Sequence, residues 1–249
     1  MTKNVMLMSI MSIILLISAC SAEEISVGEV IAVGAELVQA SLLDESDIKN
    51  IAAQASEKID SEHQLAAPGS QYSQRLKRLV AGIDHSEKYN FKVYISEKIN
   101  AFAMADGTIR IYSGLMDIMS DAELLAVIKH EIGHVEHKHL YQQTKKMLYT
   151  NAAFKALIAA GGTVGELTQT QLGQLAYKMV NAHFSQNDEL EADAYAVKSL
   201  ARTQHDPLAM KLAIKALQKH AGGGGGFLSS HPSNDKRINN IEEQIASLK

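Results

Sequence analysis

The feature that most constrains this chain is the segment His130-Glu131-Ile132-Gly133-His134. Residues four apart share one face of an α-helix, so both imidazoles can point at the same ion. Glu131 lies about 100° further round the helix, where its carboxylate can reach a water on that ion without binding the ion itself. This spacing is typical of hydrolases that use a single zinc ion. The motif therefore predicts a helix that carries a zinc site.

The beginning of the chain is expected to lie outside the folded domain. An apolar run from Val5 to Ile17 follows Lys3 and is too short to cross a bilayer as a helix, which takes about 20 residues. Residues 17–20 resemble a bacterial lipoprotein cleavage site, and Cys20 is the only cysteine. We therefore expect a signal peptide at 1–19, a lipid on Cys20, a tether at 20–45 and a folded domain at 46–249.

This leader also predicts where the protein resides. Ser21 follows the expected anchor, where an Asp would resemble a signal for retention in the inner membrane. Because no Asp stands at this position, we expect the lipid anchor to hold the protein at the periplasmic face of the bacterial outer membrane. With Cys20 lipidated no thiol is left for a disulfide, so the exported domain is expected to depend on its core and its metal.

Charge and aromatic content exclude one class of partner. The net charge is −4, the 24 Lys and Arg residues are scattered, and there is no Trp. Nucleic-acid binding requires a basic stripe or an aromatic stacking platform. We therefore expect no nucleic-acid partner.

Periodicity predicts an α+β domain that is mainly helical, with a small sheet of about three strands. Strand formers alternate at 91–95, and two further strands at 100–105 and 108–112 flank the hairpin signal Asp106-Gly107. Ser120 and Glu123 form a capping box at the start of the helix that carries the motif. Other helices are expected at 46–61 with Ser46 as the cap, from 72 to 83, at 169–183, at 188–202, from Pro207 and at 234–248.

Two further segments have distinctive compositions. Residues 151–165 are apolar, and we interpret them as a buried helix near the active site, with a membrane-dipping or lid segment as the alternative. Five consecutive glycines at 222–226 predict a flexible linker.

A catalytic zinc usually takes three protein ligands, so a third must come from elsewhere in the chain. Leu140 stands where HExxHxxGxxH enzymes place their third histidine, which excludes that subclass. His137 and His139 lie nearby, and we interpret both as solvent-exposed side chains at the helix end, where a cation suits the helix dipole.

A better candidate is an acidic cluster further along the chain. Glu189 and Asp193 are four residues apart and share a helical face. One of them can bind the metal while the other holds a ligand imidazole through its distal N–H. Glu191 points away from that face and is expected to be solvent-exposed.

Several motifs in this order resemble the Ste24-like zinc metallopeptidases. They are HEIGH, then Glu189 and Asp193 within SQNDELEADAYA, then His231-Pro232 followed by Arg237. The upstream segment NAFAMADGTIRIYSGLM is similar to the strand-turn-strand that precedes the zinc helix in this family. The similarity extends over about residues 47–249, so the resemblance implies a zincin-like metallopeptidase domain with the small sheet beside the HExxH helix.

The resemblance also implies roles for individual residues. His130, His134 and Glu189 would bind one Zn²⁺ per chain, and Asp193 would orient a ligand. Glu131 would act as general base and acid, taking a proton from the attacking water and delivering it to the leaving amine. His231 would either stabilise the oxyanion or occupy the open zinc position at rest.

The function implied is a zinc endopeptidase that cleaves misfolded or unassembled proteins of the bacterial envelope, with other envelope proteins as partners. The substrate is expected to pair along the exposed edge of the sheet near 100–105. One alternative is a membrane-tethered periplasmic chaperone or assembly factor with a normally closed zinc site. Another is a zinc hydrolase acting on a non-peptide bond, which is disfavoured because no cell-wall-binding segment is present.

Overall fold

The computed structural model describes residues 44–151, 154, 167–220 and 226–248. The predicted signal peptide, Cys20 and nearly all of the predicted tether lie outside the described residues, as do most of segment 151–165 and of the glycine run 222–226. None of the helices in the described part of the chain is both long and apolar enough to cross a membrane.

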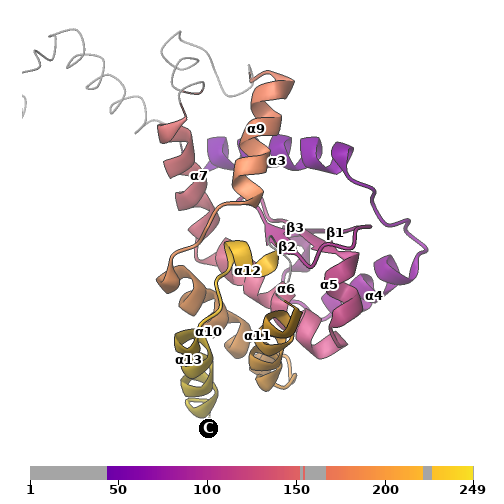
Figure 1. Cartoon of the computed structure of the whole chain (residues 1–249), viewed down its shortest axis with the longest axis vertical. Helices are drawn as coiled ribbons and strands as arrows, with labels where there is room; N and C mark the ends of the chain where they lie inside the picture. The colour runs from indigo at the N-terminus through magenta and orange to yellow at the C-terminus, as the bar shows by residue number, and fades with distance from the viewer. Residues whose placement is uncertain (1–43, 152–153, 155–166, 221–225, 249) are drawn as a thin grey trace, which may run out of the picture. The chain divides into compact units, whose positions relative to one another are not determined.

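The predicted class, α+β and mainly helical with a three-stranded sheet, is confirmed (Figure 1). In chain order the elements are α3 (Glu45–Glu62), α4 (Gln71–Val80), η2 (Ser86–Lys88), β1 (Asn90–Tyr94), β2 (Ala101–Ala103), β3 (Thr108–Tyr112), α5 (Ser113–Ile118), α6 (Asp121–Glu136), α7 (His139–Thr150), α9 (Gln169–Val180), α10 (Gln186–Arg202), α11 (Leu208–His220), α12 (Phe227–Ser230) and α13 (Asp235–Ala246).

The sheet has the strand order β1-β3-β2, so β2 lies at an edge. β1 runs parallel to β3, and β2 is antiparallel to β3 through the predicted hairpin. Gly107 makes this turn with a φ of 88°, a left-handed conformation that favours glycine. In Figure 1 the sheet lies between α3 on one side and α6 on the other.

One edge of β2 is left for other contacts. The N–H of Tyr112 donates to the carbonyl of Asn100, and the N–H of Met104 donates to the carbonyl of Thr108. Because backbone groups alternate between the two sides of a strand, the N–H and C=O groups of residues 101 and 103 point away from β3. The outer edge is not exposed, contrary to the prediction from the sequence: residues 101–105 are at most 8% exposed, because α6 packs against β2 and Glu131 on α6 accepts a hydrogen bond from the backbone of Ala103.

Helix α3 begins one residue earlier than predicted, and the predicted cap is wrong. The side chain of Asp44 accepts from the N–H of Asp47 at 3.0 Å, and the Asp47 carboxylate accepts from the N–H of Asp44 at 3.1 Å. Ser46 is therefore not the cap, because this reciprocal box satisfies the end of the helix; its hydroxyl donates to Asp44 instead. The apolar face is buried as its spacing indicated, at Ile48, Ile51, Ala52, Ala55 and Ile59.

The partly buried carboxylate of Asp60 ties α3 to the sheet. Asp60 accepts from Arg110 at 2.8 and 2.9 Å, from Lys92 at 2.7 Å and from the Tyr94 hydroxyl at 2.7 Å. Burial alone would raise the pKa of Asp60, but the hydrogen bonds from Arg110, Lys92 and Tyr94 lower it to about 2. The Asp60 carboxylate is therefore charged at neutral pH, and it holds three positions on β1 and β3 against one helix.

The other elements follow the sequence patterns with shifted ends. α6 begins after Ser120, whose capping box with Glu123 is confirmed. α10 begins two residues before the predicted start, because Ser185 caps it through the N–H of Asp188. α4 ends at Val80, three residues before the predicted end. The short helices α5 and α12 were not predicted, because neither is long enough to show a periodic pattern.

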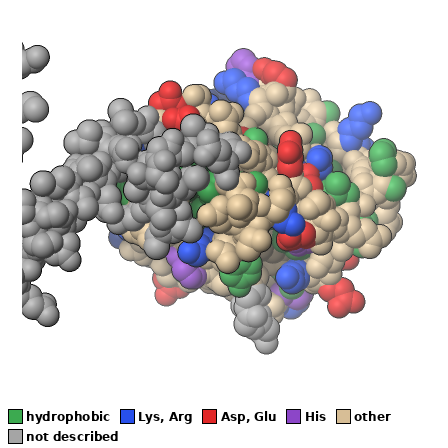
Figure 2. Space-filling view, turned by 90° about the horizontal axis from the view of Figure 1, so that it is seen from above, with side chains coloured by type: hydrophobic (Ala, Val, Ile, Leu, Met, Phe, Trp, Pro, Cys, Tyr) green, Lys and Arg blue, Asp and Glu red, His purple; other side chains and the backbone are tan. Residues whose placement is uncertain are grey.

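Basic and acidic side chains are interspersed on the described part of the face shown in Figure 2, with hydrophobic side chains scattered between them.

Candidate metal centre

Two long helices bring the predicted site residues together. α6 carries His130, Glu131 and His134, and α10 carries Glu189 and Asp193; each of the five is at most 1% exposed. The two helices pack closely along the motif. A β-carbon on Gly133, the glycine of HEIGH, would lie 3.0 and 3.1 Å from backbone atoms of Ala192. The glycine thus lets α10 approach close enough to bring its carboxylates to the histidines.

Four side chains place one ligand atom each at the centre. They come from α6, α10 and the loop after α12, and they are His130, His134, Glu189 and His231. The Nε2 atoms of His130 and His134 are 3.1 Å apart. Nδ1 of His231 lies 3.3 Å from Nε2 of His130 and 2.9 Å from Oε1 of Glu189. The Glu189 carboxylate lies 3.4 Å from Nε2 of His134 and 3.6 Å from Nε2 of His130.

This donor set fits a zinc ion. Nδ1 of His130 lies 2.9 Å from Oδ1 of Asp193, and Nδ1 of His134 lies 3.1 Å from Nδ1 of His139, so each ring has a partner for a proton on its distal nitrogen. With the protons there, the two Nε2 lone pairs face each other across 3.1 Å. Two facing lone pairs repel unless a cation lies between them.

The separations agree with the size of the ion. Zinc takes four ligands in a tetrahedron at about 2.0–2.1 Å for nitrogen, which places neighbouring ligand atoms about 3.3–3.4 Å apart. The five distances given above, which involve one or the other oxygen of Glu189, range from 2.9 to 3.6 Å. The four side chains thus lie close enough together to share one ion.

Asp193 and Arg237 form a support behind the ligands. The Arg237 guanidinium donates to both oxygens of Asp193 at 2.7 Å and lies 2.6 Å from Oε2 of Glu189. Arg237 is completely buried and also donates to the carbonyl of His231 at 3.3 Å. One cation from α13 thus fixes both carboxylates of α10 and the loop that carries His231.

The electrostatics keep these carboxylates charged. Burial would raise the pKa of Glu189, but His231, His134 and Arg237 together lower it. Burial would likewise raise the pKa of Asp193, and the Arg237 guanidinium lowers it. For His134, burial lowers the pKa well below its usual value, which favours the neutral imidazole that metals bind.

The pKa of Glu131 is shifted in the opposite direction to those of Glu189 and Asp193. Burial raises its pKa, and although His231, His130 and the Ala103 backbone act in the opposite direction, the net shift is upward. Its Oε1 has no hydrogen-bond partner among the described residues, and its nearest ion-pair contact is Nε2 of His231 at 3.5 Å. A raised pKa and a free oxygen suit a group that accepts a proton and later releases it.

Aromatic rings enclose the site on the side of His231, and they were not predicted. The Phe184 ring stacks on His134 with a centroid distance of 3.8 Å, and the Phe227 ring stacks on His231 at 4.3 Å. Both phenylalanines lie at or beyond the ends of predicted helices, so periodicity gave no signal for them.

One interpretation from the sequence is wrong. His139 was expected to be solvent-exposed, but it is only 7% exposed and contacts His134. The reason is local, because Lys138 adopts a left-handed conformation with a φ of 59° and turns the chain into a new helix, α7. His137 and Glu191 are exposed, as predicted.

The chain is similar to known proteins over most of its length. The model of Peptidase family M48 matches residues 67–245. Metalloprotease LoiP of Escherichia coli (strain K12) is 38% identical over 218 residues, which cover 86% of each chain. Metalloprotease YcaL of the same organism is 32% identical over 254 residues and the full length of both chains. Among solved structures, S. mikatae Ste24p covers 85% of this chain and 57% of its own, with a TM-score of 0.46 and 16% identity.

Proposed function

Because this chain belongs to peptidase family M48 and is a zinc metalloendopeptidase, we propose that it cleaves misfolded or unassembled proteins of the bacterial cell envelope. The predicted family, the predicted class of enzyme and the predicted zinc cofactor are confirmed. The observation that carries the proposal is the buried cluster in which two imidazoles and one carboxylate meet beside Oε1 of Glu131, which has no hydrogen-bond partner among the described residues.

In the proposed mechanism His130, His134 and Glu189 would hold the zinc, and Asp193 would orient the His130 ring. When bound, zinc lowers the pKa of a water toward about 7 and polarises a carbonyl. The Glu131 carboxylate would take a proton from the attacking water as the water adds to the scissile carbonyl. Glu131 would then deliver that proton to the leaving amine nitrogen.

The outer edge of β2 is the proposed place for the substrate backbone. The N–H and C=O groups of residues 101 and 103 point away from β3, these residues are at most 5% exposed, and the Ala103 N–H is hydrogen-bonded to Glu131. A peptide paired with this edge would have to displace that contact, and it would then pass beside the proton acceptor. Pairing through the main chain is tolerant of sequence, which suits clients that share no sequence but are unfolded.

The envelope location rests on the leader of the chain. A short apolar run followed by a lipoprotein cleavage site at Cys20 supports lipidation of Cys20, with the chain tethered to the periplasmic face of the outer membrane. Proteins that fail to fold or assemble in the envelope would be within reach of a tethered domain, and other envelope proteins are proposed as its partners.

His231 is proposed to close the site at rest. Its Nδ1 lies 2.9 to 3.3 Å from other ligand atoms, so it would fill the fourth position that a substrate or water needs. Stacking on Phe227, the first residue of α12, couples the ring to that helix, which directly follows the glycine run. Displacing His231 would open the centre. The alternative proposal, a chaperone with a closed zinc site, depends on the same contact.

The substitution His231→Ala tests this arrangement. If the closed form holds about 90% of the molecules, removing the imidazole should raise cleavage of unfolded casein about 10-fold. Zinc content should stay at one per chain, because three ligands remain. The measurement is the initial rate of casein cleavage, with the exposed His220 substituted to Ala as the control.

A fall in cleavage with zinc retained would instead place His231 in catalysis, as a group that stabilises the oxyanion. If neither wild type nor His231→Ala cleaves casein while both suppress its aggregation, the chaperone alternative holds and the proposed protease function fails.

A further inference from the structure

His139 joins the zinc ligand His134 to a carboxylate at the surface. Nδ1 of His134 lies 3.1 Å from Nδ1 of His139, and Nε2 of His139 lies 3.0 Å from Oε2 of Glu191. His139 is the first residue of α7 and is 7% exposed, whereas the Glu191 side chain is 57% exposed. The contact therefore runs from the buried centre to the surface through a single imidazole.

The backbone is bent to make this contact. Lys138 adopts the left-handed conformation, which is unfavourable for a residue with a side chain, and this brings His139 back toward the end of α6. A strained backbone of this kind persists where the surrounding structure requires it.

The proton positions follow from the geometry. His134 directs Nε2 at the other ligand atoms, so its one ring proton must be on Nδ1 and must be donated to Nδ1 of His139. His139 then accepts at Nδ1 and carries its own proton on Nε2, which it donates to Glu191. If His134 binds metal through Nε2, only one proton position is therefore possible on each of the two rings.

We propose that His139 is a positioning residue for zinc, which fixes the tautomer and the ring orientation of His134, and that Glu191 fixes His139 in turn. This inference rests on the proposed role of His134 as a ligand. Both histidines of HEIGH would then have a partner that orients the ring through its distal nitrogen. For His130 this partner is Asp193, and for His134 it is His139, which in turn contacts Glu191.

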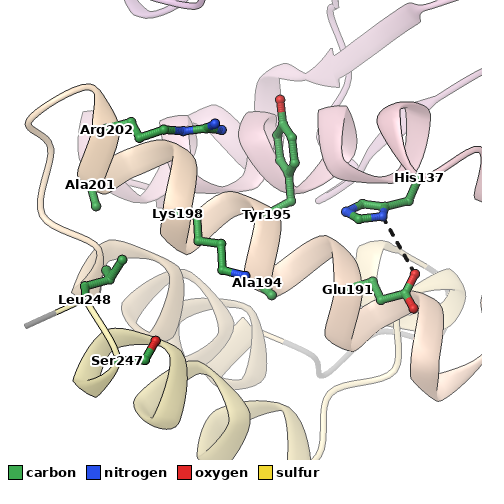
Figure 3. A pocket seen from close by; sticks show the side chains of 9 residues that line it. All are labelled: His137, Glu191, Ala194, Tyr195, Lys198, Ala201, Arg202, Ser247 and Leu248. Carbon is green, nitrogen blue, oxygen red and sulfur yellow. Dashed lines mark ion pairs between the residues drawn. The ribbon is translucent and has the colours of Figure 1, made fainter.

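A rival use of the same residues is a second cation site. His137, His139 and Glu191 offer ligand atoms within 4.8 Å of one another. In Figure 3 His137 and Glu191 face each other on the wall of a pocket of about 740 Å³, with 3.8 Å between Nδ1 of His137 and Oε2 of Glu191. A cation here would need the Nε2 lone pair of His139. The His139 proton would then move to Nδ1 and oppose the proton of His134, so the two uses exclude each other.

The test measures zinc affinity by competition with a chromophoric chelator. His139→Leu removes the acceptor and should weaken zinc binding about 10- to 100-fold. His139→Asn keeps an acceptor near the position of Nδ1 and should restore affinity to within about 3-fold of wild type. His137→Leu, the matched control on the neighbouring exposed histidine, should leave affinity unchanged.

Unchanged affinity in His139→Leu would overturn the positioning role, while loss of zinc in His134→Ala would show that the proposed centre still stands. Two zinc ions per wild-type chain, with one lost in both His137→Leu and His139→Leu, would establish the second cation site instead.

If His139→Leu does not fold, Glu191→Ala at an exposed position supplies the test. It should weaken zinc binding about 3- to 10-fold, less than the loss of a direct partner of the ligand, and no change there would also overturn the proposal.

Discussion

Replacing Glu131 with Gln should reduce casein cleavage at least about 10³-fold while the protein keeps one zinc per chain. The amide has nearly the shape of the carboxylate but cannot take up a proton, and positioned acid-base groups contribute about 10²- to 10⁴-fold to a rate. The raised pKa of Glu131 and its free Oε1 both support this role. The measurement is kcat on unfolded casein together with zinc analysis of the same sample.

A control for this substitution lies on the same helix. Glu136→Gln makes the same chemical change at an exposed position, where the side chain accepts from the Tyr89 hydroxyl and still can as an amide. Its kcat should stay within about 2-fold of wild type. Undiminished proteolysis in metal-replete Glu131→Gln protein would remove Glu131 from its assigned role as base.

The second large effect is expected at Arg237. Substitution to Met, of similar length, would leave the carboxylates of Asp193 and Glu189 buried without their cation. Removing one partner of a buried ion pair costs about 3–5 kcal/mol, so the free energy of unfolding should fall by about that amount. The loss should be smaller in zinc-loaded protein, because the bound ion supplies positive charge beside Glu189.

Urea unfolding measures the loss in free energy of unfolding for Arg237→Met, both in protein treated with a chelator and in zinc-loaded protein. Lys236→Met removes one positive charge from the adjacent position of the same helix, where the side chain is exposed, and should change stability by no more than about 0.5 kcal/mol. Equal losses for Arg237→Met in the two samples would mean that the guanidinium and the metal do not share the same carboxylates.

Local patterns predicted much of the fold and the candidate ligands. The capping box at Ser120 and the four-residue spacings of the histidines and acids depend only on helix geometry, so they could be read directly from the sequence. The residues alone did not separate Glu189 from Asp193. The structure separates them, because Glu189 reaches the ligand atoms whereas Asp193 lies behind His130 and is paired with Arg237.

Contacts between distant parts of the chain could not be predicted in this way. The parallel pairing of β1 with β3 depends on tertiary packing, not on strand pattern. The exposure predicted for His139 is wrong because the left-handed residue Lys138 redirects the chain into α7, so the end of α6 does not place His139 in solvent. A single positive φ at a lysine has no signature in the sequence, and it decides which imidazole supports His134.

The most direct test is X-ray absorption at the zinc edge on the chain purified without added metal. We expect one zinc per chain, with nitrogen and oxygen neighbours at about 2.0–2.1 Å, histidine features in the spectrum and loss of the signal in His134→Ala. Absence of zinc, or a zinc signal unaffected by His134→Ala, would contradict the proposed zinc centre.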